Sequence, residues 1–211
     1  MSSGQPLQAL VFDLGGVIVP HDNSVLKRRL AGRCSAPDAL DWLSRAEDDE
    51  RIGTGELAIP DLHRLVVDEI GYAGDWPTFK ADWCCHLTLD HDMLDFVERL
   101  ASANRVMLFS NTNREHWESQ VVASDGRLSR LEAYLSHEIG AVKPHVAAFL
   151  LVAKRAAIDP ARSLFIDDRM DHVEAARRAG YQAEQFTDQA ALSELLRSRG
   201  VRWANQERTY P

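Results

Sequence analysis

The feature that most constrains the fold is the segment 9–19, ALVFDLGGVIV, an apolar run with one carboxylate at its centre. A short run of Leu, Val and Phe that ends at two glycines predicts a fully buried strand of a parallel sheet. An unpaired carboxylate inside such a strand would cost several kcal/mol or take up a proton. We therefore expect Asp13 at the end of the strand, facing a cation, a phosphate or both. The alternative is an Asp whose side chain only caps the turn.

Composition limits the possible partners and the compartment. The chain has 211 residues and a formal net charge of −8, whereas nucleic-acid binding needs a basic surface, so we expect no nucleic-acid partner. No apolar segment approaches the length of a membrane span, so we expect no membrane association. Asp13 interrupts the N-terminal apolar run, so we expect no signal peptide. Cys34 and the adjacent pair Cys84-Cys85 form no C-x-x-C motif, which favours reduced thiols and a cytoplasmic location.

Residues 20–88 show helical patterns without a strand-like run. Apolar spacing and caps predict helices over 24–33, 38–51, 56–70 and 75–83, with a break at 53–55. The sequence Asp75-Trp76-Pro77 is typical of a helix cap followed by Pro in the first turn. We expect a small helical bundle that holds Trp42, Trp76 and Trp83 in its core rather than in a ligand cage.

From residue 90 onward the pattern changes to alternating helices and strands. Strands are predicted over 105–109, 133–136, 163–166 and 181–186, with amphipathic helices between and after them. Alternation of this kind is typical of a parallel sheet covered by helices on both faces. The predicted fold class is therefore α/β, a Rossmann-like three-layer core with a mainly parallel sheet and an inserted small α-helical domain.

Polar side chains follow the ends of these strands, and together they suit the binding of one ligand. Asp13 follows the first strand, Ser110-Asn111 the second and Asp167-Asp168 a later one, while Lys143 precedes a helix. Ligands of an open parallel sheet bind outside the carboxyl ends of its strands, so the four sets should converge. Carboxylates offer the oxygen ligands that Mg²⁺ prefers, and a hydroxyl, an amide and an ammonium suit a phosphoryl group.

These motifs resemble those of the haloacid dehalogenase-like (HAD) hydrolase superfamily, in the branch with a helical cap after the first strand (subfamily IA, variant 3). The matching segments are 12–17, 109–113, 140–144 and 165–169 with 174–176. The approach to the second motif is similar to that of bacterial glucose-1-phosphatase-like proteins. The resemblance implies a Rossmann-like catalytic core from residues 1–19 and 89–211, and an inserted cap, residues 20–88, that selects the substrate.

The resemblance also implies catalytic and phosphate-binding roles. Asp13 would attack phosphorus and form an aspartyl-phosphate. Ser110 and Asn111 would bind phosphate oxygens together with Gly16. Lys143 would hold the nucleophile and the phosphate together and offset their negative charge. The implied substrate is a small phosphorylated metabolite, bound by a monomer or a homodimer.

The implied cofactor is Mg²⁺, held by Asp13, Asp168, Asp167 and the carbonyl of Gly15. One departure from the family concerns this last position, since most phosphatases of the superfamily carry there a second Asp that acts as general acid and base. Such a group contributes about 10²–10⁴-fold to the rate. The glucose-1-phosphatase-like proteins also have Gly there. We hypothesise that such sites favour good leaving groups and use a water or a cap residue as proton carrier.

Three functions remain open at this point. The first is a Mg²⁺-dependent phosphatase acting on a sugar phosphate, with a hexose 1-phosphate favoured and acyl or aryl phosphates next. The second is a metal-free haloacid dehalogenase, which the extra carboxylates of Asp167-Asp168 disfavour because they would repel a carboxylate substrate. The third is a catalytically weak ligand-binding or regulatory protein, supported by Gly15 alone. No histidine spacing indicates Zn²⁺, and we expect His172 to have a supporting or surface role.

Overall fold

The computed structural model describes residues 6–47 and 49–204, and within them the core is a five-stranded parallel sheet in the order β3-β2-β1-β4-β5. The strands are β1 (Ala9–Phe12), β2 (Val106–Ser110), β3 (Glu132–Leu135), β4 (Ser163–Asp167) and β5 (Gln182–Gln185). The central strand β1 pairs with β2 on one side and with β4 on the other. The α/β fold class expected from the sequence is confirmed.

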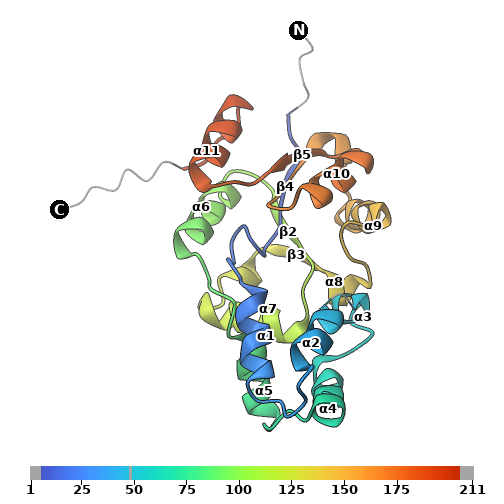
Figure 1. The fold of residues 1–211 in the computed structure, drawn as a ribbon. Coiled ribbons are helices and arrows are strands. Elements are labelled where there is room, and N and C mark those ends of the chain that lie inside the picture. The colour runs from blue at the N-terminus through green and yellow to red at the C-terminus, as the bar shows by residue number, and fades with distance from the viewer. Residues whose placement is uncertain (1–5, 48, 205–211) are drawn as a thin grey trace, which may run out of the picture.

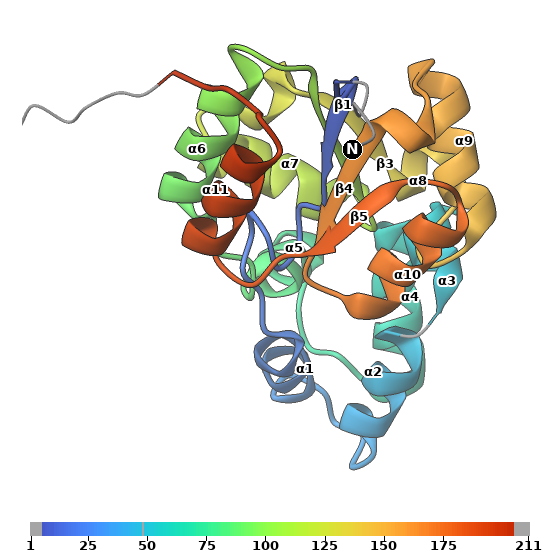
Figure 2. The ribbon, with the colours of Figure 1, turned by 90° about the horizontal axis from the view of Figure 1, so that it is seen from above.

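Helices cover both faces of this sheet, because alternate strand residues point to opposite sides. Leu10 and Phe12 of β1 face α6 (His91–Ala101) and α11 (Gln189–Ser198), and these three elements share one hydrophobic core. Ala9 and Val11 face α9 (Val146–Ala156) and α10 (Met170–Arg178) in a second core. Figure 2 shows the two helix layers on either side of the strands. The other core helices are α7 (Arg114–Ala123), α8 (Ser136–Ile139), η1 (Leu128–Arg130) and η2 (Pro160–Arg162).

The segment between β1 and α6 forms a helical bundle with a hydrophobic core of its own. Its helices are α1 (Asn23–Ala31), α2 (Ala39–Glu47), α3 (Glu50–Thr54), α4 (Ile59–Ile70) and α5 (Trp76–Cys84). Phe79, which is fully buried, lies at the centre of this third core among other bundle side chains. The bundle lies beneath the sheet and faces the ends of the strands (Figure 1).

One helix boundary differs from the expectation. The sequence predicts a single helix over 38–51, but the structure has α2 and then α3, which begins after Asp49. The Asp49 side chain accepts a hydrogen bond from the Arg51 N–H at 3.0 Å and so caps a new helix. The expected break at 53–55 is also shorter, because α3 runs through Thr54 and ends at Gly55 with φ +80. Asp48, between the two helices, lies outside the described residues.

The predicted start of α5 is confirmed. Asp75 accepts a hydrogen bond from the Thr78 N–H at 3.0 Å, and Pro77 occupies the first turn. Trp83 belongs to the bundle core and Trp42 packs against it, as expected, but both also line the cavity described below. In the described part of the chain, none of the helices has the length and apolar character that crossing a membrane requires.

Candidate active site

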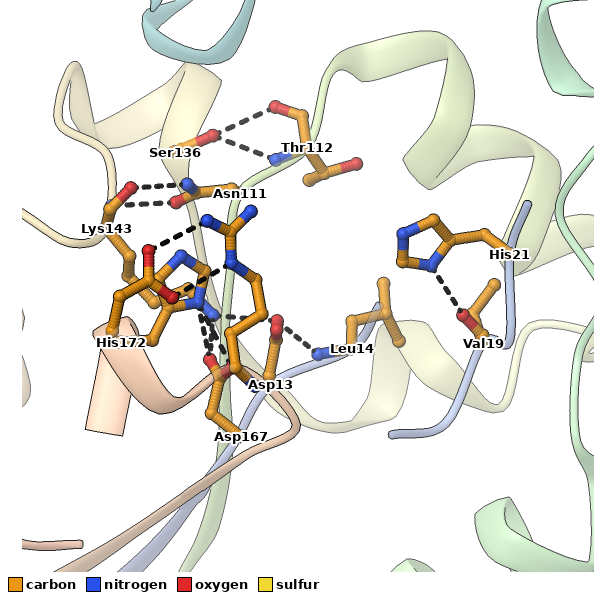
Figure 3. A network of polar contacts seen from close by, with 12 residues as sticks. Asp13, Leu14, Val19, His21, Asn111, Thr112, Ser136, Lys143, Asp167 and His172 are labelled. Atoms are coloured by element: carbon orange, nitrogen blue, oxygen red, sulfur yellow. Dashed lines mark hydrogen bonds and ion pairs between the residues drawn. The ribbon is translucent and has the colours of Figure 1, made fainter. Parts of the chain in front are cut away.

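Three strands deliver polar side chains to one edge of the sheet. Asp13 comes directly after β1, Ser110 is the last residue of β2, and Asp167 is the last residue of β4. Neighbouring strands keep these ends level, since the Asp13 N–H donates to the Ile166 carbonyl at 2.8 Å. All three side chains are buried at this edge, and Figure 3 shows Asp13 and Asp167 side by side.

Lys143 joins the two carboxylates. Its ammonium lies 2.9 Å from Asp13 Oδ1 and 2.6 Å from Asp167 Oδ2, and its side chain has no exposed surface. The ammonium also lies 5.4 Å from the Phe109 ring centroid and 5.3 Å from that of Phe165. Aromatic faces attract cations, so both rings add to the attraction that the two carboxylates exert on the ammonium.

The two carboxylates differ in their tendency to hold a proton. Burial raises the pKa of Asp13 to about 7, and the neighbouring Asp167 adds to the effect while Lys143 opposes it. Burial also disfavours the charged form of Asp167, but Lys143 and His172 together hold the pKa of Asp167 well below its usual range. Asp168 is a third carboxyl group, and its pKa is raised by burial and by Asp167. One lysine thus faces more negative charge than it can offset.

His172 supports this cluster rather than lying on the surface. It is 4% exposed, and its Nδ1 is 3.0 Å from Asp167 Oδ2. The same carboxylate accepts the Arg169 N–H at 2.9 Å through its other oxygen. These contacts fix the orientation of Asp167 against Lys143. Of the two roles expected for His172, the structure favours the supporting one.

Asn111 holds Lys143 in place through the backbone. Its Nδ2 donates to the Lys143 carbonyl at 2.8 Å, and its Oδ1 accepts the Lys143 N–H at 2.9 Å (Figure 3). Both ends of the amide are therefore engaged. The predicted contact of Asn111 with phosphate would therefore use the second hydrogen of Nδ2 or the backbone N–H.

A residue that sequence reasoning missed fixes the loop after β2. The Thr112 N–H donates to Ser136 Oγ at 2.9 Å, and the Ser136 hydroxyl donates to the Thr112 carbonyl at 3.0 Å. Ser136 is fully buried directly after β3. The rule that places ligands at the carboxyl ends of parallel strands would have indicated it.

Gly16 and Asp168 are in close contact. Gly16 has φ +70, and a Cβ built on it would lie 2.3 Å from Asp168 Oδ2. Any side chain at position 16 would displace that carboxylate, so glycine is required for the backbone conformation and for the packing. The second glycine of the predicted strand end therefore determines where Asp168 lies.

Gly15 makes room for a different ring. A Cβ on Gly15 would lie 3.3 Å from Cε1 of His21, whose Nδ1 is 3.4 Å from the Val19 carbonyl oxygen. Figure 3 shows the imidazole beside the loop that follows Asp13. His21 thus occupies the space that a side chain at position 15 would use. No sequence pattern indicated this neighbour.

The site opens into a cavity of about 450 Å³ between the sheet edge and the helical bundle. Ser110, Lys143 and Gly15 line it at the sheet edge. The bundle contributes mostly apolar side chains, namely Leu26, Leu30, Trp42, Leu43, Ile52, Leu62 and Trp83. Asn23, Lys27, Asp49 and Glu50 add polar and charged groups to the bundle side, so both apolar and charged side chains face the sheet edge.

The donor groups at this edge fit a hard divalent cation. Asp13, Asp167 and His172 each place one possible ligand atom within 4.8 Å of the others, with the Asp168 carboxylate beside Gly16. Oxygen donors and surplus negative charge suit Mg²⁺ rather than a softer metal. The His172 ring is committed to Asp167, so oxygen atoms remain the natural ligands.

Comparison with known proteins agrees with this geometry. Residues 7–180 match the haloacid dehalogenase-like hydrolase family. A D-ribitol-5-phosphate phosphatase of Bacteroides thetaiotaomicron is 27% identical in an alignment of 188 positions, which covers 85% of this chain and 91% of the relative. The chain therefore belongs to the haloacid dehalogenase-like hydrolases, and the resemblance inferred from the motifs is confirmed. Its placement within a subfamily stays a prediction.

Solved structures show the same fold. The crystal structure of a HAD family enzyme from Bacteroides thetaiotaomicron superposes with a TM-score of 0.81 at 22% identity, covering 91% of this chain and 99% of that one. A variant of that enzyme, in complex with magnesium and inorganic phosphate, gives a TM-score of 0.76 at 22% identity, covering 88% and 98%.

The contact between Gly16 and Asp168 predicts the effect of one added methyl group. Gly16→Ala should weaken Mg²⁺ binding by about 10- to 100-fold, because it displaces the Asp168 carboxylate, which is an expected ligand of the cation. Isothermal titration with Mg²⁺ measures this. The matched control is Gly200→Ala, at φ +74 with nothing within 4 Å of its Cβ, which has comparable backbone strain and should bind Mg²⁺ normally. Equal affinity in both variants would contradict the expectation.

The raised pKa of Asp13 predicts a pH dependence of Mg²⁺ affinity. Below its pKa of about 7 the carboxyl group holds a proton that the cation must displace, so affinity should fall about tenfold per pH unit there. Above pH 7 affinity should level off. Titrations at pH 6 and pH 8 in buffers of different ionisation enthalpy should show proton release mainly at pH 6. A constant affinity across that range would count against the assignment.

Proposed function

We propose that this protein is a Mg²⁺-dependent phosphatase that hydrolyses a small phosphorylated metabolite through an aspartyl-phosphate on Asp13. The observation that carries the proposal is the contact of Lys143, which lines the cavity, with both Asp13 and Asp167. A carboxylate held beside a buried ammonium suits attack on phosphorus, since catalysis of phosphoryl transfer depends chiefly on positioning and charge stabilisation.

The reaction would proceed in two displacements. An oxygen of Asp13 attacks phosphorus, so that a P–O bond to Asp13 forms while the bond to the leaving alcohol breaks. The alcohol leaves with a proton taken from solvent or from a group in the cavity. Water then attacks the aspartyl-phosphate and gives up a proton, inorganic phosphate departs, and Asp13 is restored.

The remaining site residues would bind and stabilise charge. Lys143 contacts the nucleophile and would neutralise charge on the phosphoryl oxygens, and the Ser110 hydroxyl lines the same cavity. Asn111 also lines the cavity, and it and Gly16 would complete the phosphate site. Each of these roles follows from the family's motifs and from the position of the residue at the sheet edge.

Asp13, Asp168, Asp167 and the Gly15 carbonyl would hold the Mg²⁺, whose charge offsets the surplus of carboxylates and stabilises the phosphoryl group. The magnesium and phosphate in the crystallised relative support this assignment. The chain's own contribution is to keep Asp167 ionised with Lys143 and His172, and to keep Asp168 against Gly16.

The helical bundle, residues 20–88 in our division of the chain, would act as a cap that selects the leaving group and excludes water. Gly15 leaves the usual acid–base position without a carboxylate, so a water or a cap residue would carry the proton. A sugar or sugar-alcohol phosphate is the proposed substrate class. The sequence favours a hexose 1-phosphate, whereas the named relative supports a pentitol 5-phosphate, and both fall within this class.

The two rival functions make different demands on the site. A metal-free dehalogenase would bind a carboxylate substrate next to Asp13, Asp167 and Asp168, where repulsion is strongest without a cation. A regulatory protein would bind phosphate without turning it over. Dependence on Mg²⁺ separates the phosphatase from the first rival, and turnover separates it from the second.

The test is release of inorganic phosphate from sugar, sugar-alcohol, aryl and acyl phosphates, with Mg²⁺ and with a chelator. Wild type should release phosphate only with Mg²⁺, and Asp13→Asn should lower kcat by on the order of 10³-fold or more, because it removes the nucleophile. Asp188→Asn, which alters an exposed helix cap, serves as the control. Turnover that persists with the chelator, or in Asp13→Asn, would refute the proposal.

A further inference from the structure

One face of α7 lines the active-site cavity. Asn113, which caps the helix, and His116 and Gln120 within it are spaced at i, i+3 and i+7, so they share one side of the helix. At 1.5 Å per residue, roughly 10 Å of helix axis separates Asn113 from Gln120. Polar groups thus continue from the end of the Ser110–Asn113 loop along the cavity wall.

Two of these three side chains are already engaged. The His116 N–H donates to Asn113 Oδ1 at 3.0 Å, and the Asn113 amide nitrogen lies 3.1 Å from His116 Nδ1. An amide NH₂ only donates, so His116 Nδ1 accepts, and its Nε2–H donates to the Trp83 carbonyl at 3.0 Å. The imidazole also stacks on the Trp83 ring at 5.2 Å. These contacts attach α5 of the bundle to α7.

The engaged histidine carries no charge. Burial lowers the pKa of His116 to about 3, and the nearby His86 adds to this. This stretch of the cavity wall is therefore polar but uncharged. It suits hydroxyl groups, whose hydrogen bonds need no compensating charge. Lys27 and Arg169, which also line the cavity, belong to other parts of its wall.

Gln120 differs from its two neighbours. It is only 3% exposed, and its Oε1 has no hydrogen-bond partner in the described part of the chain. A buried acceptor without a partner destabilises the folded protein, and such groups are few in native structures. Gln120 lines the active-site cavity, so a ligand bound there can supply the partner that the protein does not.

We propose that Gln120 binds a hydroxyl group of the leaving alcohol, and that it thereby selects phosphate esters of polyhydroxylated chains over aryl phosphates. A hydroxyl group both donates and accepts, so it can meet the amide in either orientation. The inference rests on the proposed phosphatase activity, because it concerns the leaving group at that same site. It adds a specificity-determining residue that no catalytic motif contains.

The test compares substrates within each variant. Wild type, Gln120→Met and Val122→Ala are assayed with Mg²⁺ on phenyl phosphate and on glycerol, tetritol and pentitol phosphates. Methionine keeps the length and the helix propensity of glutamine but removes its hydrogen bonds. Val122 lies on the same helix and is 77% exposed, so its truncation controls for changes in α7 alone. Far-ultraviolet circular dichroism and thermal unfolding check that each variant is folded.

In wild type, kcat/KM should rise with polyol length once the chain reaches Gln120. In Gln120→Met this rise should disappear, and the ratio of kcat/KM for the best polyol phosphate to that for phenyl phosphate should fall about tenfold, mainly through KM. Val122→Ala should retain the wild-type ratio.

An unchanged ratio in folded Gln120→Met would overturn the role of Gln120 while leaving the phosphatase in place. Should Gln120→Met fail to fold, wild type alone still decides, because a flat dependence on polyol length would overturn the inference. The absence of Mg²⁺-dependent turnover on every ester, phenyl phosphate included, would instead refute the proposed function, and this inference with it.

Discussion

The ammonium of Lys143, enclosed between Asp13 and Asp167, is the interaction on which the rest of the site depends. Breaking a buried ion pair by removing one partner typically costs about 3–5 kcal/mol, because an uncompensated charge stays behind. Here one ammonium serves two carboxylates, with Asp168 close by. Burial raises the pKa of Asp13, and the surplus of negative charge adds to this effect and favours the binding of a further cation. The same group of charges therefore holds the site together and underlies its proposed chemistry.

The sheet and the helical bundle have different roles in holding this concentration of charge. The sheet supplies fixed positions, since parallel strands end at one edge and the loops behind them are held by Asn111 and Ser136. The helical bundle supplies apolar side chains and several charged ones, and polar groups of α7 lie beside them. Charge at the floor would bind the phosphoryl group common to all candidate substrates, and the wall would distinguish among their alcohols.

The local sequence was sufficient to predict the sheet and the charged residues at its edge. A buried strand that ends in Asp13 has few structural solutions, and strand ends in a parallel sheet must meet, so the grouping of Asp13 with Asp167 followed from topology. The residues that surround these carboxylates could not be predicted from the sequence. His21 beside Gly15 depends on how the chain enters the bundle, and Gln120 in the cavity depends on how α7 packs against α5. The boundary between α2 and α3 was missed because the cap formed by Asp49 outweighed a continuous helical pattern.

The most direct test of the account is to trap the covalent intermediate during turnover. Reduction of an acid-quenched reaction with borotritide converts an acyl phosphate on aspartate to labelled homoserine, and peptide mass spectrometry then locates the label. The account predicts label at position 13 only, dependent on both substrate and Mg²⁺. Label at another carboxylate, or none during rapid turnover under conditions that accumulate the intermediate, would contradict the claim that Asp13 is the nucleophile.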